Sequence, residues 1–204
     1  MRFITTLASI VFTVFLVSCM GTDQNDQTGN ANHDIIESEN RITDPYEART
    51  SINHKEEIVF IYIDSPNIRQ YNDSTLVKTV ISLKNRVSEK ADSLNMGFLA
   101  MGVAITWDVN QGYDHLSKFG SFDELLIGNN WIGTGGLKYI FEDIPGRQGI
   151  PQIVLTKRVY DADESDDGTV RNFRGIESEE QIARHIGEKS FESWLNDGLL
   201  IPGY

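Results

Sequence analysis

The chain has 204 residues, of which 40% are hydrophobic and 24% charged, and its formal net charge is -12. This length allows one domain with a sizeable core once terminal segments are set aside. An acidic surface repels phosphate backbones, so we expect no nucleic-acid partner. The sequence contains a single cysteine. Neither a disulfide within the chain nor a dithiol site is therefore open to it.

The first nineteen residues have the pattern of a bacterial export signal. One positive charge precedes an apolar stretch over residues 3–17, which is short and interrupted by threonines. This favours a signal peptide over a membrane-spanning helix. Leu16-Val17-Ser18-Cys19 resembles the lipobox of bacterial lipoproteins, which implies cleavage after residues 1–18 and acylation of Cys19. We expect a lipid anchor in the bacterial cell envelope, at the periplasmic face of the outer membrane. An ordinary secretory leader with a stray cysteine is the alternative.

Residues 19–55 are predicted to form a flexible tether between this anchor and the folded domain. The segment is rich in Asn, Asp, Gln, Thr, Glu and Ser. Such a composition buries too little apolar surface to offset the entropy of ordering the chain. Two short motifs within it, Ile35-Ile36 and Pro45-Tyr46, are candidates for a local turn or for docking. The folded domain is expected over residues 56–204.

The domain is expected to begin with a buried strand, a long helix and a second buried strand. Residues 58–63 are a continuous β-branched and aromatic run, typical of a strand that is covered on both faces. Residues 74–94 carry apolar residues at spacings of three and four, which predicts an amphipathic helix. Residues 98–106 are again apolar. A right-handed crossover therefore predicts that the two strands pair in parallel.

The second half is expected to contain a short helix, a hairpin and a final helix. Residues 122–127 are assigned to a short helical piece in a glycine-rich region. Pro151 opens a β-branched run, and a proline is tolerated at the first residue of a strand. An Asp- and Gly-rich loop separates this run from residues 169–174, which predicts a hairpin. Gly175 is expected to end the second strand, and residues 176–186 to form the last helix.

This order of elements, with a proline at the mouth of the third long strand, resembles the thioredoxin-like superfamily over about residues 56–188. The resemblance implies an α/β fold with a central mixed sheet of about four strands flanked by helices. The stretch Gly149-Ile150-Pro151-Gln152-Ile153-Val154-Leu155 is similar to the family's cis-proline strand. That similarity implies a cis peptide bond before Pro151 and a role for the backbone of Ile150 in holding an extended peptide. Residues 169–186 are similar to the family's final strand, glycine turn and helix.

The redox motif of that family is missing. Where the family has Cys-x-x-Cys, this chain has Ser65-Pro66-Asn67-Ile68. Disulfide exchange needs a thiolate, which a serine hydroxyl cannot replace. We therefore expect no dithiol oxidoreductase or peroxidase activity and assign no catalytic residue. A glutathione-type enzyme stays open as an alternative, in which Ser65 and the dipole of the following helix stabilise a bound thiolate.

A shallow binding groove is expected at the carboxyl ends of the parallel strands, where ligands of α/β sheets gather. The backbone of Ile150 would pair with an extended protein or peptide segment, and Trp107 would supply apolar contact. An acid/base pair of Asp64 and Asp108 is the catalytic alternative. The candidate residues of the groove are Asp64, Ser65, Asn67, Trp107, Asp108, Ile150 and Pro151.

The remaining patterns indicate no metal site and no cofactor. The four histidines have no ligand spacing. The acidic loop over residues 161–168 imitates half of a calcium loop, but Arg174 stands where the closing glutamate should be. One further hypothesis remains open, a structural subunit of an envelope assembly. Its contact surface would be the aromatic- and glycine-rich residues 119–141.

Overall fold

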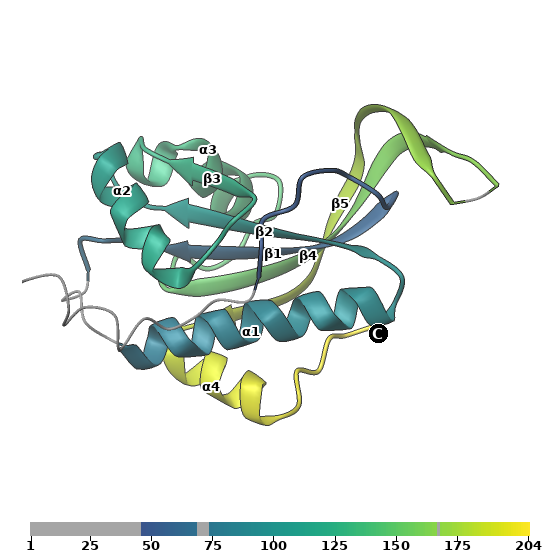
Figure 1. Ribbon diagram of the computed structural model, residues 1–204. Coiled ribbons are helices and arrows are strands. Elements are labelled where there is room, and N and C mark those ends of the chain that lie inside the picture. The colour runs from purple at the N-terminus through teal and green to yellow at the C-terminus, as the bar shows by residue number, and fades with distance from the viewer. Residues whose placement is uncertain (1–45, 69–73, 167) are drawn as a thin grey trace, which may run out of the picture. The chain divides into compact units, whose positions relative to one another are not determined.

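The computed structural model describes residues 46–68, 74–166 and 168–204. The expected signal peptide, Cys19 and most of the expected tether lie outside the described residues. The described part is an α/β domain built on one five-stranded mixed sheet (Figure 1). In spatial order its strands are β3 (Glu124–Ile127), β2 (Gly97–Ala104), β1 (Glu56–Asp64), β4 (Gln152–Glu164) and β5 (Val170–Ile186).

The first three predicted elements are confirmed. Strands β1 and β2 pair in parallel along their whole length, from Glu57 opposite Gly97 to Asp64 opposite Ala104. Helix α1 (Ser74–Ser93) connects them and buries the apolar side of the predicted periodic pattern. Both faces of β1 are covered, so residues 58–63 are fully buried. A continuous apolar run is what such a strand requires.

The short helix predicted for residues 122–127 is wrong. Residues 124–127 form β3, which lies parallel to β2 at one edge of the sheet. Its apolar run is too short to show either a helical or a strand period. Pairing with β2 decides the structure. Leu125 lies against Gly102 on one face, while Leu126 packs into the core on the other.

The final helix predicted for residues 176–186 is also wrong. These residues belong to β5, which continues through Gly175 and pairs antiparallel with β4, placing Glu179 opposite Arg158. Glu, Gln and Ala weakly favour helix in isolation, and here the partner strand overrides that preference. The last helix follows β5 as α4 (Glu188–Asn196).

Helices cover both faces of the sheet. On one face α1 and α4 lie side by side (Figure 1) and pack with Phe60 and Tyr62 in one hydrophobic cluster. On the other face α3 (Thr134–Gly136) leads into the π-helical turn η3 (Leu137–Phe141). Tyr139 and Ile140 of this turn pack with Ile61 in the second cluster. None of the described helices has the length and apolar character needed to cross a membrane.

Strands β4 and β5 extend beyond β1 as a two-stranded ribbon, at the upper right of Figure 1, which we call the arm (residues 160–164 and 170–176). The last residue of β4 that pairs with β1 is Val159. Within the arm the guanidinium of Arg174 binds the carboxylates of Asp161 and Asp163 at 2.6 and 3.0 Å. These exposed ion pairs connect the two strands of the arm in addition to the backbone ladder between β4 and β5.

The end of the expected tether docks on the domain through Asp123. Its Oδ2 accepts a hydrogen bond from the hydroxyl of Tyr46 at 2.6 Å, and its Oδ1 accepts one from the amide of Arg49 at 2.7 Å. The same carboxylate accepts the amide of Ala100 at 2.6 Å. We call residues 46–49 the strap. It lies beside the part of β2 that precedes the pairing of β2 with β3.

Candidate functional site

The predicted groove residues lie at the ends of β1 and β2 and at the entrance of β4, but they differ in exposure. The entrance of β4 adjoins the end of β1, because Gln152 pairs with Ile63. Asp64, Ser65 and Pro151 are buried, Ile150 is half-buried, and Asn67, Trp107 and Asp108 are exposed. The buried residues Asp64, Ser65 and Pro151 therefore support this end of the sheet from inside the domain and do not line an open surface.

Asp64 belongs to a buried polar network. Its side chain has no exposed surface, and its Oδ2 accepts a hydrogen bond from the hydroxyl of Tyr62 at 2.9 Å. The same oxygen lies 3.0 Å from Nε2 of His115, in α2 (Val109–Leu116). Among the described residues, Oδ1 has no hydrogen-bond partner. The role of His115 was missed, since 51 residues separate it from Asp64 and no motif links them.

Ser65 is also turned into the domain. It is only 3% exposed, and its hydroxyl donates to the carbonyl of Ile105 at 2.7 Å. Its oxygen accepts a weaker hydrogen bond, of 3.3 Å, from the amide of Asn67. The described helix α1 spans Ser74–Ser93, nine positions further along the chain at its start. These contacts do not favour the thiol-cofactor alternative.

Asp108 caps helix α2. Its Oδ1 accepts hydrogen bonds from the amides of Asn110 at 2.9 Å and Gln111 at 3.1 Å, and its own backbone is extended. An aspartate that binds the first amides of a helix in this way is an N-cap. The carboxylate is thus occupied by the helix, which does not favour an acid/base pair with Asp64. The cap also fixes the chain where Trp107 leaves the sheet, and that indole is 65% exposed.

The peptide bond before Pro151 is cis, as the resemblance implied. The flanking carbonyls have partners within the domain. That of Gly149 accepts from the side-chain amide of Gln152 at 2.7 Å, and that of Pro151 accepts from the amide of Gly187 at 2.8 Å. Between them, the N–H and C=O of Ile150 have no hydrogen-bond partner among the described residues. The side chain of Ile150 packs against the core.

Arg184 holds the loop that leads to Ile150. Its Nη2 donates to the carbonyls of Tyr139 and Ile144 at 3.0 and 2.9 Å, and its Nη1 donates to the side chain of Gln152. Burial lowers the pKa of this guanidinium. The sequence prediction missed this role because it placed Arg184 in a helix, where the side chain would not have reached the loop.

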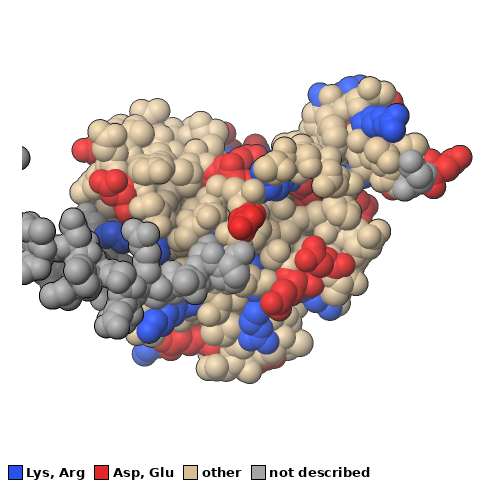
Figure 2. All heavy atoms as spheres, viewed as in Figure 1, with Lys and Arg blue, Asp and Glu red and all other residues tan. Residues whose placement is uncertain are grey.

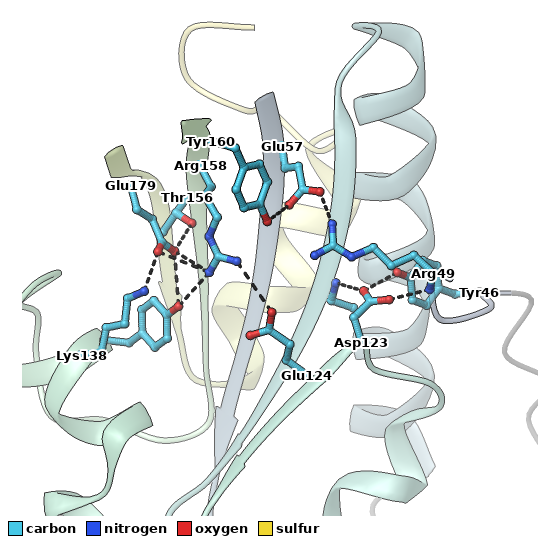
Figure 3. Close-up of polar contacts among 12 residues, drawn as sticks. Tyr46, Arg49, Glu57, Asp123, Glu124, Lys138, Thr156, Arg158, Tyr160 and Glu179 are labelled. Carbon is cyan, nitrogen blue, oxygen red and sulfur yellow. Dashed lines mark hydrogen bonds and ion pairs between the residues drawn. The ribbon is translucent and has the colours of Figure 1, made fainter. Parts of the chain in front are cut away.

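A separate polar network joins β4, β5 and η3 (Figure 3). Arg158 is 3% exposed and lies 3.3 Å from the carboxylate of Glu179. Glu179 also binds Lys138 at 2.7 Å and Thr156 at 2.9 Å. Burial alone would raise the pKa of Glu179, but the hydrogen bond from Lys138 and the charge of Arg158 outweigh it and lower the pKa. Burial likewise raises the pKa of the Tyr139 hydroxyl beside them.

A third network links the strap to the sheet (Figure 3). Glu57 of β1 is 1% exposed, accepts a hydrogen bond from Tyr160 at 2.7 Å and forms an ion pair with Arg49. These contacts join residues from the strap, β1 and β4, so we assign them a structural role. Within the part of the chain that the structure describes, no group of three or more His, Cys, Asp and Glu side chains is placed to hold a metal ion.

No protein-family model and no curated protein matches this chain. Solved structures that are similar include the C-terminal domain of a thiol-disulfide oxidoreductase from Bacteroides thetaiotaomicron, with 12% identity over 71% of this chain and 77% of that chain and a TM-score of 0.36. A thioredoxin domain of a thiol-disulfide oxidoreductase from Bacteroides vulgatus has 11% identity over 72% and 81%, with a TM-score of 0.32. A member of the Sco family of cytochrome c oxidase assembly proteins has 14% identity over 69% and 77%, with a TM-score of 0.31.

These similarities are too distant to carry an argument about function. The fold is thioredoxin-like. The parallel β1-α1-β2 unit, the antiparallel β4–β5 hairpin, the closing helix α4 and the cis bond before Pro151 together give this arrangement. The predicted fold class is therefore confirmed, with five strands where about four were expected.

Proposed function

We propose that this chain is a lipid-anchored protein of the bacterial cell envelope whose domain binds a protein or peptide and has no redox activity. The anchor is supported by the motif Leu16-Val17-Ser18-Cys19 at the end of an export signal. More than one acyl chain on Cys19 would hold the protein stably on a bilayer. The periplasmic face of the outer membrane is the location that we propose.

The open backbone of Ile150 is the observation that carries the binding proposal. The N–H and C=O of the half-buried Ile150, without partners among the described residues, can pair with an extended peptide in the manner of an added strand. Trp107, 65% exposed, offers a large apolar surface that loses little side-chain entropy on binding. A peptide with one apolar residue would use both features.

The absence of thiols supports binding without redox chemistry. The one cysteine of the sequence is the expected lipid attachment site, so no thiolate is left for disulfide exchange. The two candidate carboxylates are already engaged, Asp64 in a buried network and Asp108 at a helix cap. The groove would therefore hold a ligand without reacting with it.

The binding test uses the full chain in detergent and a display library of short, unstructured peptides. Selected peptides should bind the Trp107→Ala variant about tenfold more weakly, since loss of an aromatic anchor costs more than 1 kcal/mol. The Ile150→Asp variant should lose binding further. Phe173→Ala, which alters a half-exposed aromatic ring on the distant arm, is the matched control. Equal affinity of all three variants and the wild type would refute the groove.

The anchor and the lack of redox activity have separate tests. Cys19→Ala should move the protein from the membrane fraction to the soluble fraction, and continued sedimentation with membranes would contradict acylation at this residue. The full chain should not reduce insulin disulfides with dithiothreitol present. Measurable turnover would contradict the non-redox proposal without bearing on the anchor.

A further inference from the structure

The two edges of the sheet differ in how well they are protected against a further strand. Along β5 the pairing with β4 shifts register at three places, and each shift inserts extra residues into β5. Its exposed charged side chains include Arg171, Arg174, Glu177 and Glu180. Bulges and charges of this kind are the features by which edge strands avoid pairing with other chains.

The opposite edge is less protected, since it has no bulge and its one charged side chain is that of Glu124 at the start of β3. Strand β3 pairs with β2 on one side, and no other strand in the described part of the chain pairs with it. Its register is continuous, and after Glu124 it consists of Leu125, Leu126 and Ile127. Leu125 is 39% exposed. Beyond Glu124, the short strand β3 has neither proline, lysine nor bulge to oppose the addition of another strand.

The surface around β3 carries few charges, the exposed ones on β3 and α2 being those of Glu124 and Asp114. Residues 125–137 contain no charged side chain, in a chain that is 24% charged. Ile132, Val109 and Tyr113 are 66%, 56% and 56% exposed. Figure 2 shows few charged side chains over α2, β3 and α3, at the upper left of the molecule. Depletion of charge together with exposed aliphatic and aromatic residues is typical of the centre of a protein interface.

A small cavity lies next to the free edge. Its volume is about 150 Å³, and its walls are β3, the end of β2 and the glycine-rich turns that follow β3. The turns can approach one another this closely because glycine has no side chain. A Cβ at Gly133 would lie 2.2 Å from the carbonyl oxygen of Gly128. The main chain therefore borders this cavity.

We propose that β3 pairs antiparallel with β3 of a second copy of this chain, about a two-fold axis. Pairing about a two-fold axis covers the open edge of β3 in both copies at once, whereas an added peptide would cover the edge of one copy only. Two acidic copies repel one another, so a contact between them is favoured through a face with few charges. The surface around β3 is such a face. This dimer does not depend on peptide binding, but its face adjoins the proposed groove, since Val109 directly follows Trp107 and Asp108.

Native mass spectrometry of the full chain tests the dimer, because it counts protein copies after detergent is removed. The dimer fraction should rise with protein concentration and with added salt, which screens the repulsion between the copies. Ile132→Glu and Val109→Glu should each lower the association constant by about tenfold or more. Phe173→Glu and Ile176→Glu, at half-exposed apolar positions on the arm, are the matched controls and should dimerise like the wild type.

Hydrogen exchange of residues 124–127 gives a second measurement that needs no variant. Outer-edge amides of β3 should exchange more slowly as the dimer forms, while exchange in the arm stays unchanged. A chain that remains monomeric up to its solubility limit would overturn the proposal. So would a dimer whose β3 amides exchange at the monomer's rate, or one that Ile132→Glu leaves intact.

Discussion

His115 and Asp64 meet inside the domain, with Nε2 of the imidazole 3.0 Å from Oδ2 of the carboxylate. Asp64 ends β1, and His115 lies in the last turn of α2, so the contact fastens this helix to the central strand. The N-terminus of the same helix holds Asp108 and, just before it, Trp107. The buried contact thus fixes α2, and with it Asp108 and Trp107, at the carboxyl end of β1.

Removing the imidazole should destabilise the domain. His115→Ala removes one hydrogen-bonding group from the buried Asp64 carboxylate and leaves it the hydroxyl of Tyr62, and losing a partner at a buried polar group costs about 1–3 kcal/mol. Urea unfolding should show this loss as a lower midpoint with an unchanged slope. Asp114→Ala, at an exposed position in the same helix, is the control and should stay close to the wild type. A His115→Ala protein as stable as this control would contradict the role of the pair.

Asp108 should behave as a helix cap. Asp108→Ala should lower the free energy of unfolding by about 1 kcal/mol, because the amides of Asn110 and Gln111 lose their acceptor. Asp108→Asn keeps an acceptor oxygen and should cost much less. Thermal unfolding of both variants distinguishes hydrogen bonding by the cap from an effect of its negative charge. If the charge were what stabilises the helix, both variants would lose the same amount of stability.

The acid stability of the domain should depend on Glu179. Its pKa in the folded state is lower than the ordinary value of 4.5, so the unfolded chain takes up the proton first as the pH falls. Glu179 therefore stabilises the fold at pH values above about 4.5, and this contribution is lost as the pH falls through the folded-state pKa. Glu179→Gln should be less stable at neutral pH and lose less stability on acidification.

Glu180→Gln provides the control for that measurement, because Glu180 is the exposed neighbour on the same strand. Unfolding free energies of the three proteins at several pH values between neutral and acidic would give the slopes. Parallel curves for Glu179→Gln and the wild type would contradict the assignment.

Arg184 should control the loop that precedes Ile150. Arg184→Met removes the donors to the carbonyls of Tyr139 and Ile144, and hydrogen bonds from a charged group are worth about 1.5–3 kcal/mol each. Arg147, in the same loop, is already exposed, and local opening should let its main chain enter the active site of trypsin, so trypsin should cleave after it about tenfold faster or more. Arg184→Lys should be intermediate, since lysine cannot reproduce the planar fork.

The matched control is Arg174→Met, which removes an exposed arginine of the arm and leaves the loop contacts in place. An unchanged rate of cleavage after Arg147 in the Arg184→Met protein would show that other contacts hold the loop.

The centre of the fold was predictable because its signals are local. The apolar run over residues 58–63 reflects burial on both faces of β1, and the periodic pattern over residues 74–94 reflects the one buried face of α1. Pro151 marked the start of β4 since a proline can stand only at special positions of a sheet. Each of these features depends on neighbours a few residues away in the sequence.

The errors concern residues whose structure depends on distant partners. Residues 176–186 contain good helix formers, yet β4 is available as a partner and Glu179 reaches Arg158 across the hairpin. Asp64 and Ser65 were placed correctly at the end of β1, but their burial depends on contacts with His115 and Ile105. Sequence spacing carries no information about such contacts.

The strap ties the N-terminal end of the described chain to the sheet. Tyr46 and Arg49 are both fastened to the carboxylate of Asp123, and Arg49 also reaches Glu57 at the start of β1. A pulling force applied on the N-terminal side of Tyr46 is borne first by these side-chain bonds. The contacts at Asp123 thus lie between such a force and the ladder that joins β1 to β2.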